Sequence, residues 1–412
     1  MNNKRVVVIG GGAAGVFCAV NVARMNPSLQ VILLEKTTKL LSKVKVSGGG
    51  RCNVTHACFS IPDMLKHYPR GANFLKKAFQ HFFTTDTIKW FEERNVLLKK
   101  EDDGRMFPVS NSSQTIIDCL VAEMNRYKVE VMMKSEVRSL RSEHGQFIIE
   151  LSDFRLLTSD FVCVACGGYS KSAQFDWLRQ QGHSIAEPVP SLFTFNMPGN
   201  AITQLMGVSV PDAIIKIVGQ KLSSRGPLLI THWGLSGPAV LKLSAWGARE
   251  LAVCNWQFAI LVNWLPAFNE HTLKEKLQSV RFELGAQKVI NRHPLGLPQR
   301  LWEYLLKESG IKETVRWADL PAKEQHKLIK CCCAQEFTVS GKTTFKDEFV
   351  TAGGIQLAEI DANSMQSKIV PHLFFAGEIM DVDGVTGGFN FQHAWTSGFI
   401  AASAIARESE SQ

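Results

Sequence analysis

Residues 5–15 read RVVVIGGGAAG, and this stretch sets the expectation for the fold. Arg5–Ile9 is short, apolar and β-branched, which is typical of a strand buried on both faces. The glycines lead into a helical pattern over Ala13–Met25, and Val31–Leu34 is a second buried strand that ends at Glu35. The stretch therefore predicts a βαβ unit with its helix N-terminus beside the glycine turn.

The glycine turn matches the pattern G-x-G-x-x-G at Gly10, Gly12 and Gly15. Gly10 permits the tight turn, Gly12 lets a pyrophosphate approach the backbone, and Gly15 lets the helix pack closely on the strand. Glu35 follows twenty residues after Gly15, where a carboxylate can accept ribose hydroxyls. This context predicts a dinucleotide site, and a glycine turn without a ligand is the alternative.

The other end of the chain favours FAD over NAD as that dinucleotide. A strand pattern over Lys368–Ala376 runs into Gly377 and Glu378, and further glycines precede a helical pattern over Gln392–Arg407. In FAD proteins of this architecture, a late strand–glycine–acid element reaches the ribityl chain. The N-terminus of the following helix then faces the flavin, where the reduced ring gathers negative charge. We expect non-covalently bound FAD.

The residue pattern between these two ends predicts an inserted domain. After Pro188 and Pro190 the strands become short, and residues 271–330 are rich in helix formers. We therefore predict an α/β protein with a discontinuous Rossmann-like FAD-binding domain, residues 1–190 and 347–412. The insertion, residues 191–346, would combine a β-barrel (about 191–270 and 331–346) with a helical part (about 271–330).

Further elements of the first domain follow from local pattern. We expect strands at Val129–Met133, Val137–Leu140, Phe147–Leu151 and Phe161–Ala165, helical structure over Tyr68–Asn95 and over Ser113–Tyr127, and a glycine-rich loop at Leu41–Asn53.

Composition excludes several classes of protein. The 412 residues are 45% apolar and 20% charged, which is ordinary for a globular protein, and no apolar run is long enough to span a membrane. The N-terminal apolar run is too short for a signal peptide, so we expect a cytoplasmic protein. Ten scattered cysteines fit reduced, structural thiols, including Cys163 and Cys166 and the run Cys331–Cys333, and we expect no metal site.

Three residues are candidates for catalysis. Cys52 follows three glycines and Arg51, and it becomes a reactive thiol if these neighbours lower its pKa; a packing role is the alternative. His232 lies in a polar and aromatic loop and can donate a proton or contact substrate, unless it is a structural histidine. Arg105 lies in a charged turn and can face a substrate anion.

The positive charge is concentrated at one end of the sequence. Residues 1–110 hold 17 Lys and Arg against 8 Asp and Glu, a net charge of +9, while the rest holds 29 against 30, a net charge of −1. This predicts a basic N-terminal lobe that can bind RNA by counterion release. A solvated basic surface is the alternative.

Seven segments between residues 6 and 398 appear in the order typical of one family: GGGAAG, LLEK, KVKVSGGGRCNVT, EDDGRMFP, THWGLSGPAVL, TAGGI and FFAGEIMDVDGVTGGFNFQHAW. By these segments the chain resembles the HI0933-like flavoproteins, also called the aminoacetone-oxidase-like or BaiN/RdsA family. The resemblance implies the fold predicted above and FAD contacts at Gly10, Gly12, Ala14, Gly15, Glu35, Lys36, Lys43, Ser47, Gly50, Arg51, Cys52, Gly377, Glu378, Asp381, Gly388 and Asn390, with the backbone of Val137 at the adenine. Tyr169–Trp177 departs from the common family pattern, so no substrate contact is carried over there.

The resemblance also implies a choice of reactions. Members reduce a uridine of large-subunit ribosomal RNA to dihydrouridine, oxidise an aminoketone or reduce bile-acid derivatives, all by flavin chemistry. We expect an FAD-dependent oxidoreductase that reduces an activated C=C bond, with uridine in 23S ribosomal RNA as the first substrate to consider. A small-molecule oxidase or reductase is the alternative, and a non-catalytic flavin-binding module is a third. No second G-x-G-x-x-G follows a strand, so NAD(P)H would bind only transiently as electron donor. The sequence does not indicate the oligomeric state.

Overall fold

The computed structural model describes residues 4–343 and 350–410 and divides into two compact units. Met1–Ser191 with Lys346–Gln412 forms unit 1, and Leu192–Phe345 forms unit 2. The sequence-based domain boundaries, 190/191 and 346/347, stay predictions; the second falls among residues 344–349, outside the described part. No helix within the described residues is long and apolar enough to cross a membrane.

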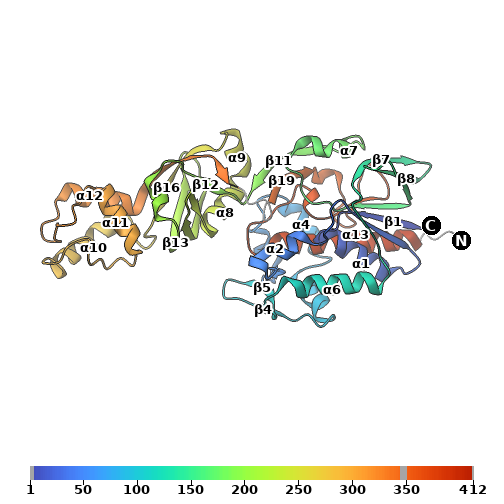
Figure 1. Ribbon diagram of the computed structural model, residues 1–412, viewed down its shortest axis with the longest axis horizontal. Coiled ribbons are helices and arrows are strands. Elements are labelled where there is room, and N and C mark those ends of the chain that lie inside the picture. Colours follow the sequence, from blue (N-terminus) through green and yellow to red (C-terminus); the bar gives the residue numbers. More distant parts are fainter. Residues whose placement is uncertain (1–3, 344–349, 411–412) are drawn as a thin grey trace. The chain divides into compact units, whose positions relative to one another are not determined.

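Unit 1 is built around a five-stranded parallel sheet in the order β20-β10-β1-β2-β6. Its strands are β1 (Arg5–Ile9), β2 (Gln30–Glu35), β6 (Glu130–Met133), β10 (Phe161–Val164) and β20 (Leu373–Phe375). Figure 1 labels β1 of this sheet and the helices α1 (Ala13–Met25) and α13 (Phe389–Glu410) of the same unit. All four residues of β10 and all three of the edge strand β20 are buried, as expected of a parallel sheet that is covered on both faces. The predicted α/β, Rossmann-like fold is confirmed.

The two ends of the chain meet on this sheet. Helix α1 (Ala13–Met25) follows β1, and helix α13 (Phe389–Glu410) packs against it. A Cβ atom on Gly398 of α13 would lie 2.7 Å from the carbonyl oxygen of Ala14, so the two helices approach at backbone distance. The first and last segments of the sequence therefore form one structural core.

Smaller sheets and helices complete unit 1. The antiparallel sheets are β7 (Val137–Glu143) with β8 (Gln146–Leu151) and β9 (Leu156–Ser159), β3 (Thr55–His56) with β5 (Arg105–Pro108) and β4 (Leu98–Lys100), and β11 (Ile185–Ser191) with β19 (Val350–Ile355). The helices are α2 (Ser42–Gly50), α3 (Ile61–Leu65), α4 (Ala72–Ala78), α5 (Thr84–Glu92), α6 (Ser113–Arg126) and α7 (Asp176–Arg179), with 3₁₀ turns η1 (Ser172–Phe175), η3 (Leu357–Glu359) and η4 (Gly377–Ile379).

Three local predictions were wrong in extent. Leu41–Asn53 is not simply a loop, because Ser42 begins a helical turn that breaks at Ser47–Gly49. Tyr68–Asn95 holds two helices, α4 and α5, since the chain leaves helical geometry after Ala78. The strand expected over Lys368–Ala376 is only β20, whose three residues are those paired with β10.

Unit 2 joins a barrel-like sheet to a helical part. The sheet order is β17-β16-β13-β14-β15-β12-β18, and β17 and β18 are consecutive through Gly341, so the sheet closes on itself. Its strands are β12 (Thr194–Asn196), β13 (Ser209–Ile217), β14 (Ser223–Ile230), β15 (Gly234–Ser236), β16 (Gln257–Asn263), β17 (Gln335–Ser340) and β18 (Lys342–Thr343). The helices are η2 (Ala201–Leu205), α8 (Pro238–Trp246), α9 (Ala248–Val253), α10 (Glu270–Glu283), α11 (Gln299–Glu308) and α12 (Ala322–Ala334).

The expected basic N-terminal lobe is wrong, because residues 1–110 are part of unit 1 and not a separate body. Residues 346–412 belong to the same unit and hold 3 Lys and Arg against 9 Asp and Glu. Over the whole of unit 1 the count is 28 against 27, a net charge of +1. Unit 2 holds 18 against 11, a net charge of +7, so it carries most of the positive excess.

Candidate functional site

The turn after β1 requires glycine at two positions for packing. Gly10 has a φ of +115°, and a Cβ atom there would lie 2.4 Å from the carbonyl oxygen of Ala165. A Cβ atom on Gly15 would lie 1.9 Å from the carbonyl oxygen of Gly10. Side chains at these positions would push α1 away from the sheet, as the sequence argument requires.

Gly12 is different, because a Cβ atom there would meet nothing within 4 Å. Gly12 is also the N-cap of α1, and no side chain caps the helix. The first amide groups of α1 therefore face open space at the positive end of the helix dipole. This is the arrangement that a pyrophosphate needs.

Glu35 ends β2 next to this turn. Its carboxylate accepts hydrogen bonds from the backbone N–H of Gly11 at 2.9 Å and of Thr37 at 2.7 Å. These bonds hold the carboxylate beside the glycine turn. Its oxygens can accept further hydrogen bonds there, including bonds from ribose hydroxyls. Lys36, the next residue, holds its ammonium 6.0 Å from the ring centroid of Tyr169.

The second glycine turn, Ser47–Cys52, presents bare backbone. Gly48, Gly49 and Gly50 all have positive φ, and a Cβ atom on Gly49 or Gly50 would meet nothing within 4 Å. Ser47 is bonded locally, its hydroxyl donating to the carbonyl of Val44 at 2.9 Å. A flat ring or a phosphate can therefore approach this backbone closely.

Cys52 does not meet the condition for a reactive thiol. Its side chain is fully buried, and burial raises the pKa of the thiol to about 12, although a hydrogen bond with Ser47 lowers it. The expected lowering by Arg51 is absent, because that guanidinium is directed to Glu101. Cys52 is a packing residue in this structure.

Arg51 and Arg105 come together at one carboxylate. Arg51 Nη1 lies 2.5 Å from Glu101 Oε1, and Arg105 Nη2 lies 3.3 Å from Glu101 Oε2. Both guanidinium groups also lie near the ring of Phe107, at 4.0 and 5.4 Å from its centroid. Arg105 pairs in addition with Asp103 at 2.7 Å. The fold thus joins two candidates that are 54 residues apart in sequence.

The strand–glycine–acid element contacts the N-terminal turn directly. A Cβ atom on Gly377 would lie 2.8 Å from Cβ of Ala14, so these two candidate residues are in contact. Glu378 accepts a hydrogen bond from the N–H of Thr351 at 2.8 Å and pairs with Lys43 at 2.7 Å. Lys43, Ala14, Gly377 and Glu378 therefore lie in one region, as the resemblance implies.

The loop before α13 is held by side-chain bonds to backbone. The amide of Asn390 bonds the N–H and the carbonyl of Gly384, both at 2.8 Å. A Cβ atom on Gly388 would lie 2.5 Å from the carbonyl oxygen of Thr55. In the orientation that satisfies both of its ends, the Asn53 amide accepts from the N–H of Gly388 and donates to the carbonyl of Thr55. Asp381 donates its backbone N–H to the carbonyl of Ile355 at 3.1 Å.

Sequence reasoning missed the buried ion pair that supports this loop. Asp383 is fully buried and binds the guanidinium of Arg70 through both carboxylate oxygens, and the hydroxyl of Ser191 donates to it at 2.8 Å. Burial raises the pKa of Asp383, while Arg70 and Ser191 lower it. In the sequence, Asp383 was noticeable only because it lies in the last family segment, seven residues before Asn390.

Three histidines were missed as well. His56 and His67 each stack on Phe389, the first residue of α13, at 4.8 and 4.2 Å between ring centroids. His393 is buried within α13, where its Nε2 lies 3.1 Å from the carbonyl oxygen of Gly377 and its Nδ1 has no hydrogen-bond partner. Burial lowers the pKa of His393 to about 4. His56 and His67 lie outside the segments that carry the family resemblance, and His393 lies in the last of them but was given no role there.

The remaining sequence candidates belong to other elements or have other partners. His232 belongs to unit 2, where it is exposed and its ring lies 4.2 Å from that of Trp233. Val137 begins β7 and pairs with Leu151. Cys163 and Cys166 have raised pKa values, the first through Cys18 and burial and the second, to about 11, through burial. Within the described residues, no group of three His, Cys, Asp or Glu could hold a metal ion.

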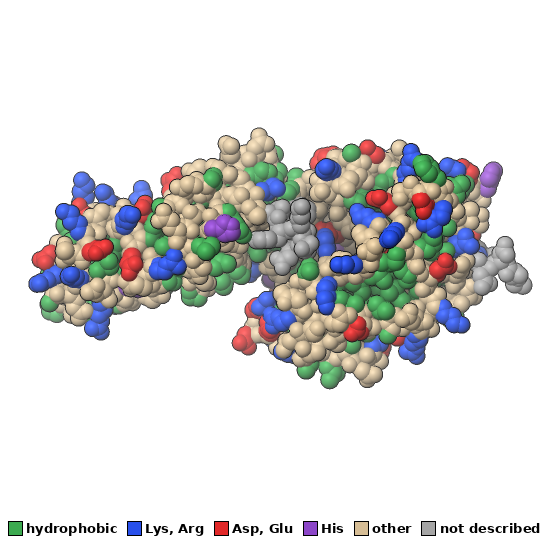
Figure 2. Space-filling view, viewed as in Figure 1, with side chains coloured by type: hydrophobic (Ala, Val, Ile, Leu, Met, Phe, Trp, Pro, Cys, Tyr) green, Lys and Arg blue, Asp and Glu red, His purple; other side chains and the backbone are tan. Residues whose placement is uncertain are grey.

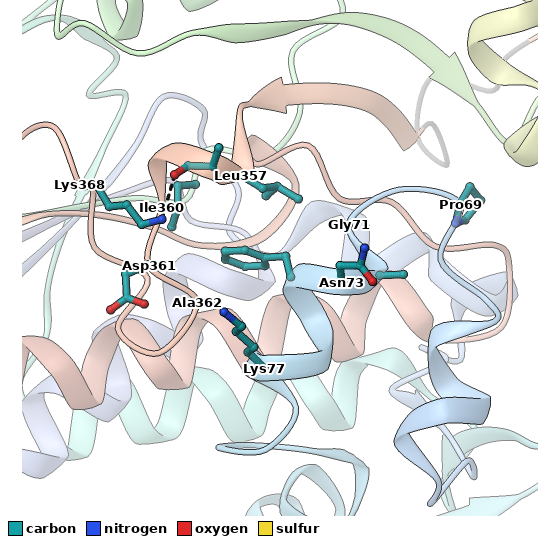
Figure 3. A pocket seen from close by; sticks show the side chains of 12 residues that line it. Pro69, Gly71, Asn73, Lys77, Leu357, Ile360, Asp361, Ala362 and Lys368 are labelled. Carbon is teal, nitrogen blue, oxygen red and sulfur yellow. Dashed lines mark hydrogen bonds between the residues drawn. The ribbon is translucent and has the colours of Figure 1, made fainter.

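A separate cavity of about 600 Å³ opens in unit 1 between the start of α4 and the segment 357–368 (Figure 3). Its lining mixes apolar residues with the charged groups Lys77, Asp361 and Lys368, and Lys368 donates to the carbonyl of Ala358 at 2.9 Å. None of the candidate residues named above lines it.

Comparison with known proteins gives a match over nearly the whole chain. The family model described as the HI0933-like protein Rossmann domain matches residues 4–404. A ribosomal RNA dihydrouridine synthase of Escherichia coli is 30% identical over 412 residues, covering 98% of each chain, and one of Haemophilus influenzae is 28% identical, again over 98% of each. A 3-dehydro-bile acid delta(4,6)-reductase of Clostridium scindens is 26% identical, covering 98% of this chain and 99% of the relative.

Solved structures support the fold at lower identity. A flavocytochrome c3 fumarate reductase in an open conformation aligns with a TM-score of 0.51 and 16% identity, over 98% of this chain and 78% of the other. A 3-ketosteroid-delta4-(5alpha)-dehydrogenase of Rhodococcus jostii RHA1 aligns with a TM-score of 0.51 and 13% identity, over 97% of each. At such identities the likeness concerns the fold.

Proposed function

We propose a substrate and a mechanism on the premise that this chain belongs to the HI0933-like family and is an FAD-dependent oxidoreductase. The proposed reaction is reduction of an activated C=C bond, and the proposed substrate is a uridine of 23S ribosomal RNA, which becomes dihydrouridine. Two full-length relatives carry the name ribosomal RNA dihydrouridine synthase, which favours this substrate.

The observation that carries the cofactor proposal is the pair of bare glycine turns. Where a side chain would otherwise stand, Gly12, Gly49 and Gly50 leave open space, and the uncapped N-terminus of α1 faces the first of these positions. A dinucleotide needs close backbone approach at its pyrophosphate and a positive helix end beside it. The residues present therefore fit FAD.

The residues proposed to hold FAD without a covalent bond are those implied by the family resemblance. They are Gly10, Gly12, Ala14, Gly15, Glu35, Lys36, Lys43, Ser47, Gly50, Arg51, Cys52, Val137, Gly377, Glu378, Asp381, Gly388 and Asn390. For Cys52 the proposed contact is through its backbone, because its side chain is fully buried.

When bound, FAD supplies hydride transfer, with NAD(P)H as the proposed electron donor. One carbon of the uracil C=C bond accepts the hydride, and a protein acid supplies the proton that its neighbour needs. Arg51 and Arg105, gathered at Glu101, are proposed to orient the polar edge of the substrate. His232 is the proposed proton donor. His56 and His67 are the next candidates, because their rings stack on Phe389, the first residue of α13.

A small-molecule substrate is the alternative, and one relative favours it. The bile acid reductase covers the chain as completely as the RNA-modifying relatives do. Such an enzyme would need no polyanion-binding surface, so its activity would depend little on ionic strength. A cytoplasmic location is proposed for either substrate.

The test is modification mapping of 23S ribosomal RNA from cells with and without this protein. We expect one dihydrouridine to disappear in its absence and to return when purified protein, FAD and NAD(P)H are added to the unmodified RNA. An unchanged map would exclude the RNA substrate. Turnover of an enone by the same purified protein would then support the alternative.

A further inference from the structure

Helix α12 in unit 2 exposes a stripe of basic side chains. Lys323, His326, Lys327 and Lys330 are exposed and fall within an arc of about 100° around the helix axis. The opposite arc holds the buried residues Gln325, Leu328, Ile329 and Cys332. The acidic residue of the helix, Glu324, is half-buried and lies at the edge of the stripe.

This stripe does not serve the stability of the helix. Lys323 and Lys327 are four residues apart and Lys327 and Lys330 are three apart, so each pair places like charges next to each other on the surface. Lys323 also lies in the first turn, where the helix dipole disfavours a cation. The spacing of these lysines therefore does not favour the helix by itself, whereas a bound polyanion would offset the repulsion between them.

The lysines of the stripe are also free of carboxylate partners. Within the described residues of unit 2, the ion pairs are Arg225 with Asp212 and His271 with Glu275, and neither involves α12. By sequence spacing, Lys274 and Lys307 each follow a glutamate by four residues, and within the stripe only Lys327 has such a neighbour, Glu324 three residues before it. Figure 2 shows basic and acidic side chains intermixed on the visible face of the helical part. The α12 stripe is thus distinguished by three exposed lysines on one arc of a single helix, with one half-buried glutamate at its edge.

We propose that the stripe Lys323, Lys327 and Lys330 of α12 binds the phosphate backbone of the RNA substrate. The three lysines span about 10 Å along the helix, which matches contact with two or three successive phosphates. His326 lies on the same stripe and adds positive charge when protonated. The inference rests on the proposed function and assigns RNA binding to unit 2, whereas the flavin residues belong to unit 1.

The test compares two variants that remove equal charge. Lys323→Gln, Lys327→Gln and Lys330→Gln together remove the stripe, and Lys274→Gln, Lys307→Gln and Lys312→Gln remove three lysines that have glutamates nearby. Binding of a fluorescein-labelled fragment of 23S ribosomal RNA is measured by anisotropy between about 50 and 200 mM salt. We expect the stripe variant to lower the slope of log K against log salt by about two and to bind roughly tenfold or more weakly at low salt. The control should change the slope by less than half as much.

Further measurements separate this inference from misfolding and from the proposed function. Flavin absorbance and helical circular dichroism should be unchanged in both variants, and Lys323→Arg, Lys327→Arg and Lys330→Arg together should restore the slope. Equal slopes for the stripe variant and the wild type would overturn the inference while leaving the dihydrouridine result intact. The inference would also be overturned if the wild-type protein did not bind RNA but bound anionic vesicles through these lysines. The modification map would still test the proposed function independently.

Discussion

Unit 1 and unit 2 differ in net charge and in the residue types that build them. Unit 1 is nearly neutral and uses glycine, backbone amides and buried polar side chains to shape a surface around its parallel sheet. Unit 2 has a continuous apolar core that includes Trp264, Trp302 and Trp317 and carries a net charge of +7. The comparison shows that net charge has to be counted over a folded unit and not over a stretch of sequence. The first 110 residues are strongly basic in sequence, but acidic residues near the C-terminus belong to the same unit and cancel that excess.

The largest effect should come from filling the open space at Gly12 in unit 1. Gly12→Val should yield a folded protein that purifies without flavin and has lost activity by at least a thousandfold, because the side chain would occupy the space proposed for the pyrophosphate. Absorbance near 450 nm after incubation with FAD is the measurement. Gly15→Ala should instead lower the melting temperature, because its Cβ atom would collide with the backbone of Gly10. If Gly12→Val is yellow and active, the pyrophosphate of FAD does not occupy the space at Gly12.

A second test compares one ion pair from each unit. Asp383→Ala should lower the free energy of unfolding by about 3–5 kcal/mol, because it removes both carboxylate oxygens that bind the largely buried guanidinium of Arg70. Asp212→Ala in unit 2 should cost about 0–1 kcal/mol, because the Arg225–Asp212 pair is exposed. Denaturant unfolding of the holoenzyme measures both changes. Equal costs would show that burial does not distinguish the two pairs.

Buried histidine should make unit 1 sensitive to acid. The pKa of His393 is about 4 in the folded protein against an ordinary value of 6.5, so between these values the unfolded chain binds more protons. The free energy of unfolding should therefore fall as pH decreases from 6.5, by about 3 kcal/mol at pH 4. His393→Gln should lose this part of the pH dependence, whereas the exposed control His144→Gln should keep it. An unaltered pH profile for His393→Gln would show that other groups cause the acid sensitivity.

The smallest effect expected concerns the proton donor, and it tests whether unit 2 takes part in chemistry. His232→Gln should lower kcat about a hundredfold while the protein keeps its flavin, because the proposed acid is lost. His271→Gln, an exposed histidine on α10, is the matched control and should change kcat less than twofold. If His232→Gln is fully active and His67→Gln is not, the acid comes from unit 1.

Much of unit 1 was predictable because its signals are local. The burial of β1, the need for Gly10 and Gly15, and the position of Glu35 all follow from residues within one βαβ unit. The family resemblance assigned both Ala14 and Gly377 to FAD, and the structure shows that these two residues are in contact. The meeting of Arg51 and Arg105 at Glu101 could not be predicted, because it depends on how β5 and the second glycine turn pack. Cys52 was misjudged for a related reason: neighbours in sequence did not reveal that its thiol is fully buried.

The sequence by itself determined the class of fold and the kind of cofactor, because glycine spacing and strand periodicity act through backbone geometry within a few residues. Only the tertiary structure decided which charges share a unit, that Asp383 is buried against Arg70, and that the lysines of α12 form one exposed stripe. Burial and electrostatics depend on neighbours in space, and the chain brings those neighbours together from distant positions.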